Sequence, residues 1–399
     1  MIQSQDDMAV FDIPLFQLAF RPFFLFGAGF ASLAMIVWLA KLNGWWTISL
    51  YGGGFFWHVH EMLFGFVAAI VVGFLLTAVQ AWTGQRSING ASLAILFALW
   101  IVARFGFLLV REPTIWLAAI DIGFLISAAV FLAIPIIKVK QWRNLFFVPI
   151  LGLFALADAM MNLGVLNQNH RLEVAGAQGA LGLICVLIVV VGGRVIPAFT
   201  ASGTATQKVE ARPWLDRFAL GSVWLFMLMM LTGADRILPQ DWKCALLVLA
   251  FTANLIRWVR WRFWITFSVP LLWTLHLAYL FIVLGFAALA VSFVNAGFAA
   301  SIAWHLITIG GMGGLILSMI SRVSLGHTGR PIIARRWMLP AYGGVFAAAV
   351  IRTAMVSWFP GKYELWLNLA GILWTLSFAS FVACYAAFLF GPRADVTRS

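Results

Sequence analysis

The residues with the clearest capacity for chemistry are histidines and one glutamate embedded in apolar sequence. His58, His60 and Glu61 stand together in one apolar run, and His276 and His305 lie singly in two later runs. An ionisable group at membrane depth costs about 2.5 to 3.5 kcal/mol on insertion scales, and such groups usually mark function. A planar macrocycle needs an apolar slot with an imidazole above and below. These histidines therefore predict a haem site.

The two histidines of the first run cannot easily share one site. His58 and His60 are two residues apart, which is about 200° around a helix. The face of His58 continues through Glu61, Met62 and small residues to Gly73 and suits close helix packing. The face of His60 is broader and more apolar as far as Val71. We expect His60 or His58 to form the haem pair with His305.

Other polar residues also lie deep in the predicted helices. Arg104, Asp121, Asp158 and Arg352 fall in the halves of their helices nearer the outer face. Glu61 and Arg104 could orient an imidazole or pair with a haem propionate. For His276 a plain hydrogen-bonding role is the alternative to ligation. His327 lies in a cytoplasmic turn, where a helix end and an anion site are the alternatives.

The elements that must position these residues are membrane-spanning helices. Of 399 residues, 63% are hydrophobic and only 10% are charged, against about 25% charged in soluble domains. This composition excludes a soluble enzyme, a disordered chain and a nucleic-acid module. No CxxC or CxxCH motif is present, which excludes zinc ribbons, dithiol redox sites and covalent c-type haem. Any haem is therefore expected to be b-type and non-covalent.

Twelve apolar runs are long enough to cross a bilayer core of about 30 Å, which takes roughly 20 residues. They start near Pro22, Phe56, Gly90, Thr114, Arg143, Glu173, Trp214, Pro239, Thr266, Gly297, Trp337 and Lys362. With the N-terminus inside, inner segments hold 18 of the 26 Lys and Arg residues and outer segments hold 6. This bias predicts cytoplasmic termini and accounts for the net charge of +12 without a nucleic-acid partner. We expect a cytoplasmic segment 1–21, one transmembrane domain 22–390 and a cytoplasmic tail 391–399.

Three predicted helices end alike on the cytoplasmic side. The second ends in Thr83-Gly84, the sixth in Ser202-Gly203 and the tenth in Thr328-Gly329, at spacings of 119 and 126 residues. These spacings favour three repeats of four helices, and the alternative is that helix exits simply prefer such residues.

Six segments of the chain carry distinctive motifs. They read Arg21-Pro22-Phe23-Phe24, Trp57-His58-Val59-His60-Glu61-Met62, Gly193-Arg194-Val195-Ile196-Pro197, Leu275-His276-Leu277-Ala278-Tyr279, Trp304-His305-Leu306 and Ser321-Arg322-Val323-Ser324-Leu325-Gly326-His327-Thr328-Gly329-Arg330-Pro331. Together these motifs resemble the NnrS family of bacterial membrane proteins, and the resemblance covers nearly the whole chain. The resemblance implies a twelve-helix inner-membrane protein that contains haem and copper. It also implies a place in the nitric oxide response of denitrifying and related bacteria, with protection from nitrosative stress. The motif histidines carried over are His58, His60, His276, His305 and His327, with Glu61 beside them.

The expected architecture is also similar to the main subunit of haem–copper oxidases and nitric oxide reductases, which hold a haem between histidines of helices 2 and 10. The sixth and seventh predicted helices carry no histidine here, so the copper ligands of those oxidases are absent and oxygen reduction is not expected. Copper would need His276, the free histidine of the second helix, or Met62.

The leading hypothesis is a haem-binding inner-membrane protein that handles nitric oxide. Whether it is a haem-dependent oxidoreductase, supplied by quinol or another electron donor, stays open. One alternative is a transporter of haem, metal or a small anion. Another is a sensor or assembly partner without turnover. Oligomeric state is not predicted.

Overall fold

The regular secondary structure of the described residues is entirely helical. The computed structural model describes residues 13–45, 47 and 49–394, and no β-strand occurs among them. Within these residues, twelve helices are long and apolar enough to cross a membrane, which confirms the predicted all-helical polytopic class. Their observed starts lie within four residues of the predicted ones, the largest difference being at Pro270. Parts of the two predicted terminal segments, residues 1–12 and 395–399, lie outside the described residues.

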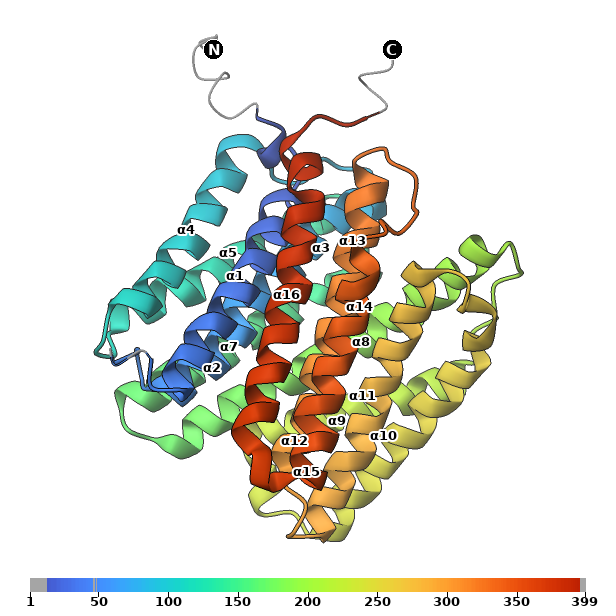
Figure 1. Ribbon diagram of the computed structural model, residues 1–399. Coiled ribbons are helices and arrows are strands. Elements are labelled where there is room, and N and C mark those ends of the chain that lie inside the picture. Colours follow the sequence, from blue (N-terminus) through green and yellow to red (C-terminus); the bar gives the residue numbers. More distant parts are fainter. Residues whose placement is uncertain (1–12, 46, 48, 395–399) are drawn as a thin grey trace. The chain divides into compact units, whose positions relative to one another are not determined.

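Seven spans are single α-helices (Figure 1). They are α1 (Phe20–Leu42), α4 (Gly90–Leu109), α5 (Ile115–Lys138), α8 (His170–Thr204), α9 (Pro213–Thr232), α10 (Gln240–Arg260) and α11 (Pro270–Val294). Proline stands at the first position of α9 and α11, where its missing N–H costs nothing. Gly84 and Gly233 adopt left-handed conformations directly after α3 and α9 and so end those helices.

The other five spans are composite. Three of them have a π-helix between two α-helices: α2 (Gly54–His60), π-helix Glu61–Val67 and α3 (Ala68–Thr83); α12 (Ala300–His305), π-helix Leu306–Gly313 and α13 (Gly314–His327); and α14 (Met338–Val350), π-helix Ile351–Met355 and α15 (Val356–Trp358). A fourth span joins α6 (Trp142–Leu145) to α7 (Phe147–Leu166). The last begins with a 3-10 turn (Pro360–Lys362) and continues as α16 (Tyr363–Phe390). Wide π turns are rare and recur at functional sites.

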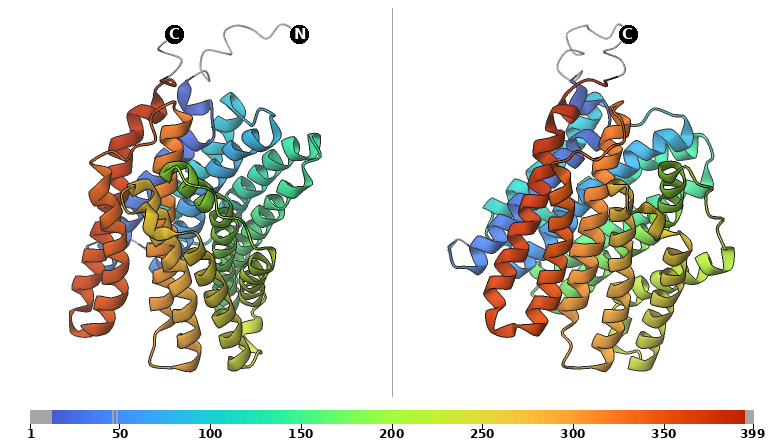
Figure 2. Two further views of the ribbon diagram at one scale, coloured as in Figure 1. Left: turned by 90° about the vertical axis from the view of Figure 1, so that its right-hand side faces the viewer. Right: turned by 45° about the vertical axis from the view of Figure 1, so that its right-hand side comes forward.

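The chain divides into two compact units, which are described separately. Unit 1 comprises Met1–Ala180, Val323–Ile332 and Phe381–Ser399, and unit 2 comprises Leu181–Arg322 and Ile333–Ser380. In unit 1, α5 packs against α3, α4 and α7, and α1 packs against α3. In unit 2, α10 packs against both α9 and α11, and Figure 2 shows these helices side by side.

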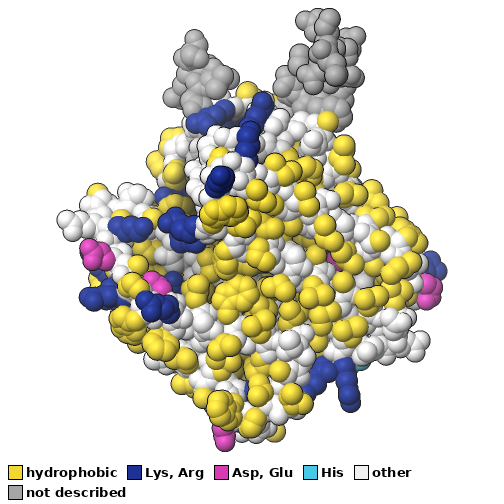
Figure 3. All heavy atoms as spheres, turned by 180° about the vertical axis from the view of Figure 1, so that it is seen from behind, with side chains coloured by type: hydrophobic (Ala, Val, Ile, Leu, Met, Phe, Trp, Pro, Cys, Tyr) yellow, Lys and Arg dark blue, Asp and Glu magenta, His cyan; other side chains and the backbone are white. Residues whose placement is uncertain are grey.

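Large apolar side chains are exposed along many spans. Ile95, Phe105 and Ile134 are each more than half exposed. Hydrophobic side chains spread across the middle of the face in Figure 3, and lysine and arginine gather toward its upper part, its left side and its lower right edge. Because water would penalise so much exposed apolar surface, this distribution suits a lipid environment and agrees with a multi-pass membrane protein.

Candidate functional site

Two of the predicted site histidines occupy the same position in their spans. His60 is the last residue of α2 before the π-helix Glu61–Val67, and His305 is the last residue of α12 before the π-helix Leu306–Gly313. A third π-helix contains Arg352. Each π-helix therefore directly follows, or contains, an ionisable residue whose depth in the predicted membrane span suggested a function.

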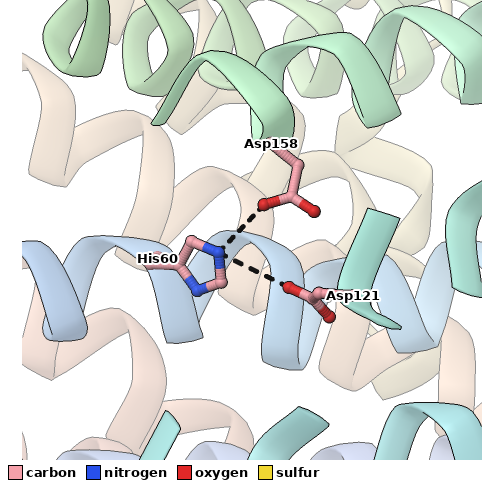
Figure 4. A group of neighbouring side chains, drawn as sticks. All are labelled: His60, Asp121 and Asp158. Atoms are coloured by element: carbon pink, nitrogen blue, oxygen red, sulfur yellow. Dashed lines mark hydrogen bonds and ion pairs between the residues drawn. The ribbon is translucent and has the colours of Figure 1, made fainter. Parts of the chain in front are cut away.

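His60 is the centre of a buried polar cluster in unit 1. Its Nδ1 lies 2.9 Å from Oε1 of Glu61, and its Nε2 lies 2.9 Å from Oδ1 of Asp158 (Figure 4). Asp121 Oδ2 lies 3.4 Å from the same Nε2. None of these four side chains is more than 1% exposed. A carboxylate on each side therefore fixes the imidazole.

Arg104 ties the acidic groups together from α4. It donates through Nη1 to Oε1 of Glu61 at 2.5 Å and through Nη2 to Oδ1 of Asp121. Asn162, one turn after Asp158 on α7, donates to the Asp158 carboxylate at 2.8 Å. Side chains from five helical segments meet here, because Glu61 belongs to the π-helix that follows α2. Three carboxylates face one guanidinium and one imidazole.

Aromatic rings separate this cluster from the apolar surroundings. Three phenylalanine rings contact the His60 ring, at centroid distances of 4.3 Å for Phe107, 5.2 Å for Phe64 and 5.3 Å for Phe56. A low-dielectric wall of this kind strengthens every electrostatic interaction inside it. The predicted apolar face of His60 is therefore present, but aromatic side chains of the protein itself fill it.

Tyr51, in the loop before α2, closes one side of the aromatic wall. Its ring meets Phe107 edge-on with centroids 4.7 Å apart, and its hydroxyl donates to the Thr114 carbonyl at 3.4 Å. Burial raises the pKa of Tyr51, the hydrogen bond at Thr114 opposes this shift, and the carboxylates of Asp158 and Asp121 add to it. The phenol therefore stays neutral.

His58 lies in a different environment from His60, as the 200° separation predicted. Its ring stacks on Trp38 of α1, with centroids 4.4 Å apart and planes 12° from parallel. The small-residue face predicted beside it is also present, because Gly65 contacts Phe30 and Gly73 contacts Phe23, both on α1.

His305 in unit 2 has a fixed orientation. Its Nδ1 lies 2.5 Å from the carbonyl oxygen of Ser301, one turn earlier on α12. Because a carbonyl can only accept, Nδ1 carries the proton and Nε2 keeps its lone pair. The helix starts at Ala300, three residues later than predicted, so His305 lies nearer that end of its span.

The glycines that follow His305 serve helix packing. Gly310 and Gly311 stand against Phe281 and Ile282 of α11, where a Cβ would overlap those side chains. The glycine run therefore brings the π-helix close to α11.

His276 lies on α11, well away from the level of His305. Its Nε2 is 2.8 Å from the hydroxyl of Thr200, and its Nδ1 has no partner among the described residues. Gly285 of α11 stands against Ile307, so the antiparallel pair places His305 near residue 287 of α11. Eleven residues at 1.5 Å each put His276 about 16 Å further along the helix. One iron cannot take both histidines.

Arg257 is a buried residue that sequence reasoning assigned only to the topological charge of an inner loop. It is 5% exposed, its Nε lies 2.8 Å from Oδ1 of Asp216, and its Nη1 donates to the Tyr279 hydroxyl at 3.1 Å. Gly193 makes room for this guanidinium, because a Cβ there would overlap Nη2. The Gly193-Arg194-Val195 motif thus has a packing reason for its glycine.

Arg21, also counted as an inner-loop charge, is buried in unit 1. Its Nη1 donates to the carbonyls of Leu389 and Gly391, at the C-terminal end of α16, at 3.0 and 2.7 Å. Cations are favourable at that end of a helix. His327 is the last residue of α13, and its ring lies 5.5 Å from that of Phe20.

The structure therefore brings together part of the predicted set. His60, Glu61 and Arg104 meet, and Glu61 contacts the imidazole of His60, whereas the helical period had placed it on the face of His58. Asp121 and Asp158 were noted as too polar for their depth, and Asn162 gave no signal beyond one amide in an apolar helix. Partners on separate helices cannot be paired from spacing alone.

With twelve candidate spans among its described residues, the chain is a polytopic membrane protein, and it holds a buried histidine–carboxylate–arginine cluster. Residues 14–393 match the family described as NnrS protein, and the chain belongs to this family. A comparison with curated proteins found no match.

Proposed function

We propose that this NnrS-family protein binds a b-type haem in the bacterial inner membrane and handles nitric oxide there. The family match over residues 14–393 supports the link to the nitric oxide response. The observation that carries the haem proposal is the geometry of His305.

His305 fits the part of an axial haem ligand. A ligating histidine almost always donates its other ring N–H to a carbonyl or carboxylate, which fixes the tautomer and raises ligand basicity. Ser301 supplies that carbonyl, and Nε2 takes no part in this hydrogen bond. Haem held by one histidine keeps the opposite axial position open to a diatomic ligand such as nitric oxide.

His60 fits this part less well, because both its ring nitrogens are held by carboxylates. The predicted pairing of His305 with His60 or His58 stays a prediction. For copper, His276 offers one buried nitrogen without a partner among the described residues, Nδ1.

An absorption spectrum of the purified protein from haem-replete cells tests the proposal. We expect a Soret band, about one haem per chain by pyridine haemochrome assay, and a shift of the band when nitric oxide is added to the reduced protein. A preparation without a Soret band would remove the haem proposal. Consumption of nitric oxide that depends on a quinol or another electron donor would establish an oxidoreductase.

A transporter is the second candidate, and one observation favours it. Buried ionisable clusters inside membrane bundles often lie on ion or proton pathways, and the His60 cluster is of this type. Uptake of haem, metal or a small anion into proteoliposomes, with no spectral response to nitric oxide, would support this alternative.

A further inference from the structure

We propose that His60, Asp121 and Asp158 bind a divalent transition-metal cation in unit 1. This site is separate from the haem proposed at His305 and does not depend on it. Each of the three residues offers one ligand atom, and these atoms lie within 4.8 Å of one another. They project from α2, α5 and α7, three helices that hold them in place (Figure 4).

The neighbours of these three residues orient them as metal ligands are usually oriented. Glu61 holds Nδ1 of His60, which leaves Nε2 facing the two aspartates. Arg104 holds Oδ1 of Asp121, and Asn162 holds Oδ1 of Asp158. Such partners fix the tautomer of a ligating histidine and the direction of a ligating carboxylate.

Three carboxylate oxygens of the cluster lack hydrogen-bond donors among the described residues. They are Oδ2 of Asp121, Oδ2 of Asp158 and Oε2 of Glu61, all on side chains at most 1% exposed. Buried polar atoms without a partner are rare and costly, and a bound ion or water commonly accounts for them. These oxygens provide an observation independent of the clustering itself.

The charge of the cluster points the same way. Three carboxylates and the Arg104 guanidinium leave two negative charges, which one divalent cation would neutralise. A doubly protonated His60 is the rival, since it can donate at both contacts of 2.9 Å. It would compensate only one charge and would leave the oxygens without donors. A cation between Nε2 and the aspartates would replace the second proton.

The donor set indicates which metals fit. One imidazole and two carboxylates, without a thiolate or thioether, suit Zn²⁺, Fe²⁺ or Mn²⁺ and disfavour Cu⁺. Three protein ligands leave at least one coordination position open, as in catalytic rather than structural zinc sites.

Metal content and binding test the site directly in the full-length protein, purified in detergent with a tag that contains no histidine. After removal of metals with a chelator, equilibrium dialysis against Zn²⁺, and separately against Mn²⁺, would be followed by elemental analysis. We expect about one cation per chain, and at least tenfold weaker binding in Asp158→Asn and His60→Gln. Asp241→Asn, at an exposed position at the start of α10, is the matched control and should bind like the wild type.

Thermal unfolding of the wild-type protein provides a second measurement, and this measurement needs no variant. Zn²⁺ added to the chelator-treated wild-type protein should raise its unfolding midpoint, because a ligand that binds only the folded state stabilises it. The same addition should leave Asp158→Asn unchanged. If the wild-type protein binds neither cation and its unfolding midpoint does not shift, the proposal is wrong and the doubly protonated His60 is supported instead. Equal binding by Asp158→Asn and wild type would also overturn it.

Discussion

Asp158 Oδ1 lies 2.9 Å from Nε2 of His60, although 98 residues separate the two positions and they belong to different helices. With Arg104 and Asp121, this contact joins α2, α4, α5 and α7 through charged groups in an otherwise apolar bundle. The cluster therefore holds helices together, in addition to its candidate chemical role. Its members should respond differently to substitution, according to the charge that each one leaves behind.

Replacement of Arg104 by methionine should be strongly destabilising. It would leave the carboxylates of Glu61 and Asp121 buried without their cation, and breaking a buried ion pair costs about 3 to 5 kcal/mol. The check is the midpoint of thermal unfolding in detergent. Arg111→Met, at an exposed position after α4, should leave the midpoint within error of the wild type. Equal midpoints for both variants would show that the cluster does not stabilise the bundle.

Replacement of His305 by alanine should remove or change the haem signal, because no other group would replace its Nε2. The Soret absorbance per chain, together with a pyridine haemochrome assay, measures this loss. His170→Ala is the control, since that side chain is 76% exposed and should have no effect. An unchanged spectrum in His305→Ala would clear this residue of ligation.

A side chain at position 193 should disturb the ion pair between Arg257 and the partly exposed Asp216 in unit 2. Gly193→Val would push the Arg257 guanidinium away from Asp216, and overpacking of this kind costs typically about 1 to 3 kcal/mol. Gly221→Ala is the contrasting change, because a Cβ there would meet nothing within 4 Å. In α9 that change should be neutral or stabilising by up to about 1 kcal/mol. Chemical denaturation of the two variants in mild detergent separates these outcomes.

Arg21→Gln should destabilise unit 1 by about 2 kcal/mol, because hydrogen bonds from charged donors contribute roughly 1.5 to 3 kcal/mol. The shorter amide would leave the carbonyls of Leu389 and Gly391 without their present donor. Limited proteolysis near residue 391 offers a local measurement. Faster cleavage there than in the exposed-site variant Arg86→Gln is expected, and equal rates would contradict this role for Arg21.

Hydrophobic run length predicted most of the fold. The membrane solvent permits few structures other than helices, so the twelve spans and their starts follow from apolar length and breaking residues alone. The pairing of Glu61 with His60 did not follow, because the helical period had placed Glu61 on the face of His58. The contacts of Asp121, Asp158 and Asn162 did not follow either, because they depend on which helices become neighbours.

The π-helices account for another part of what the sequence did not predict. Faces drawn from position 58 to 73 assumed 3.6 residues per turn throughout, whereas the segment Glu61–Val67 is wider. The glycines after His305 allow Phe281 and Ile282 of α11 to approach. Arg257 was counted among the charges of the inner segments, and its burial depends on Asp216 and Tyr279.

The bond from Arg21 to the end of α16 spans 368 residues of sequence and so sets an order on biogenesis. The first span is synthesised long before Leu389. The Arg21 guanidinium therefore lacks these acceptors until eleven further spans have been made. Chains truncated before α16 would leave the Arg21 guanidinium without these two carbonyl acceptors. The hydrogen bonds of Arg21 in α1 can therefore form only after α16 has been synthesised.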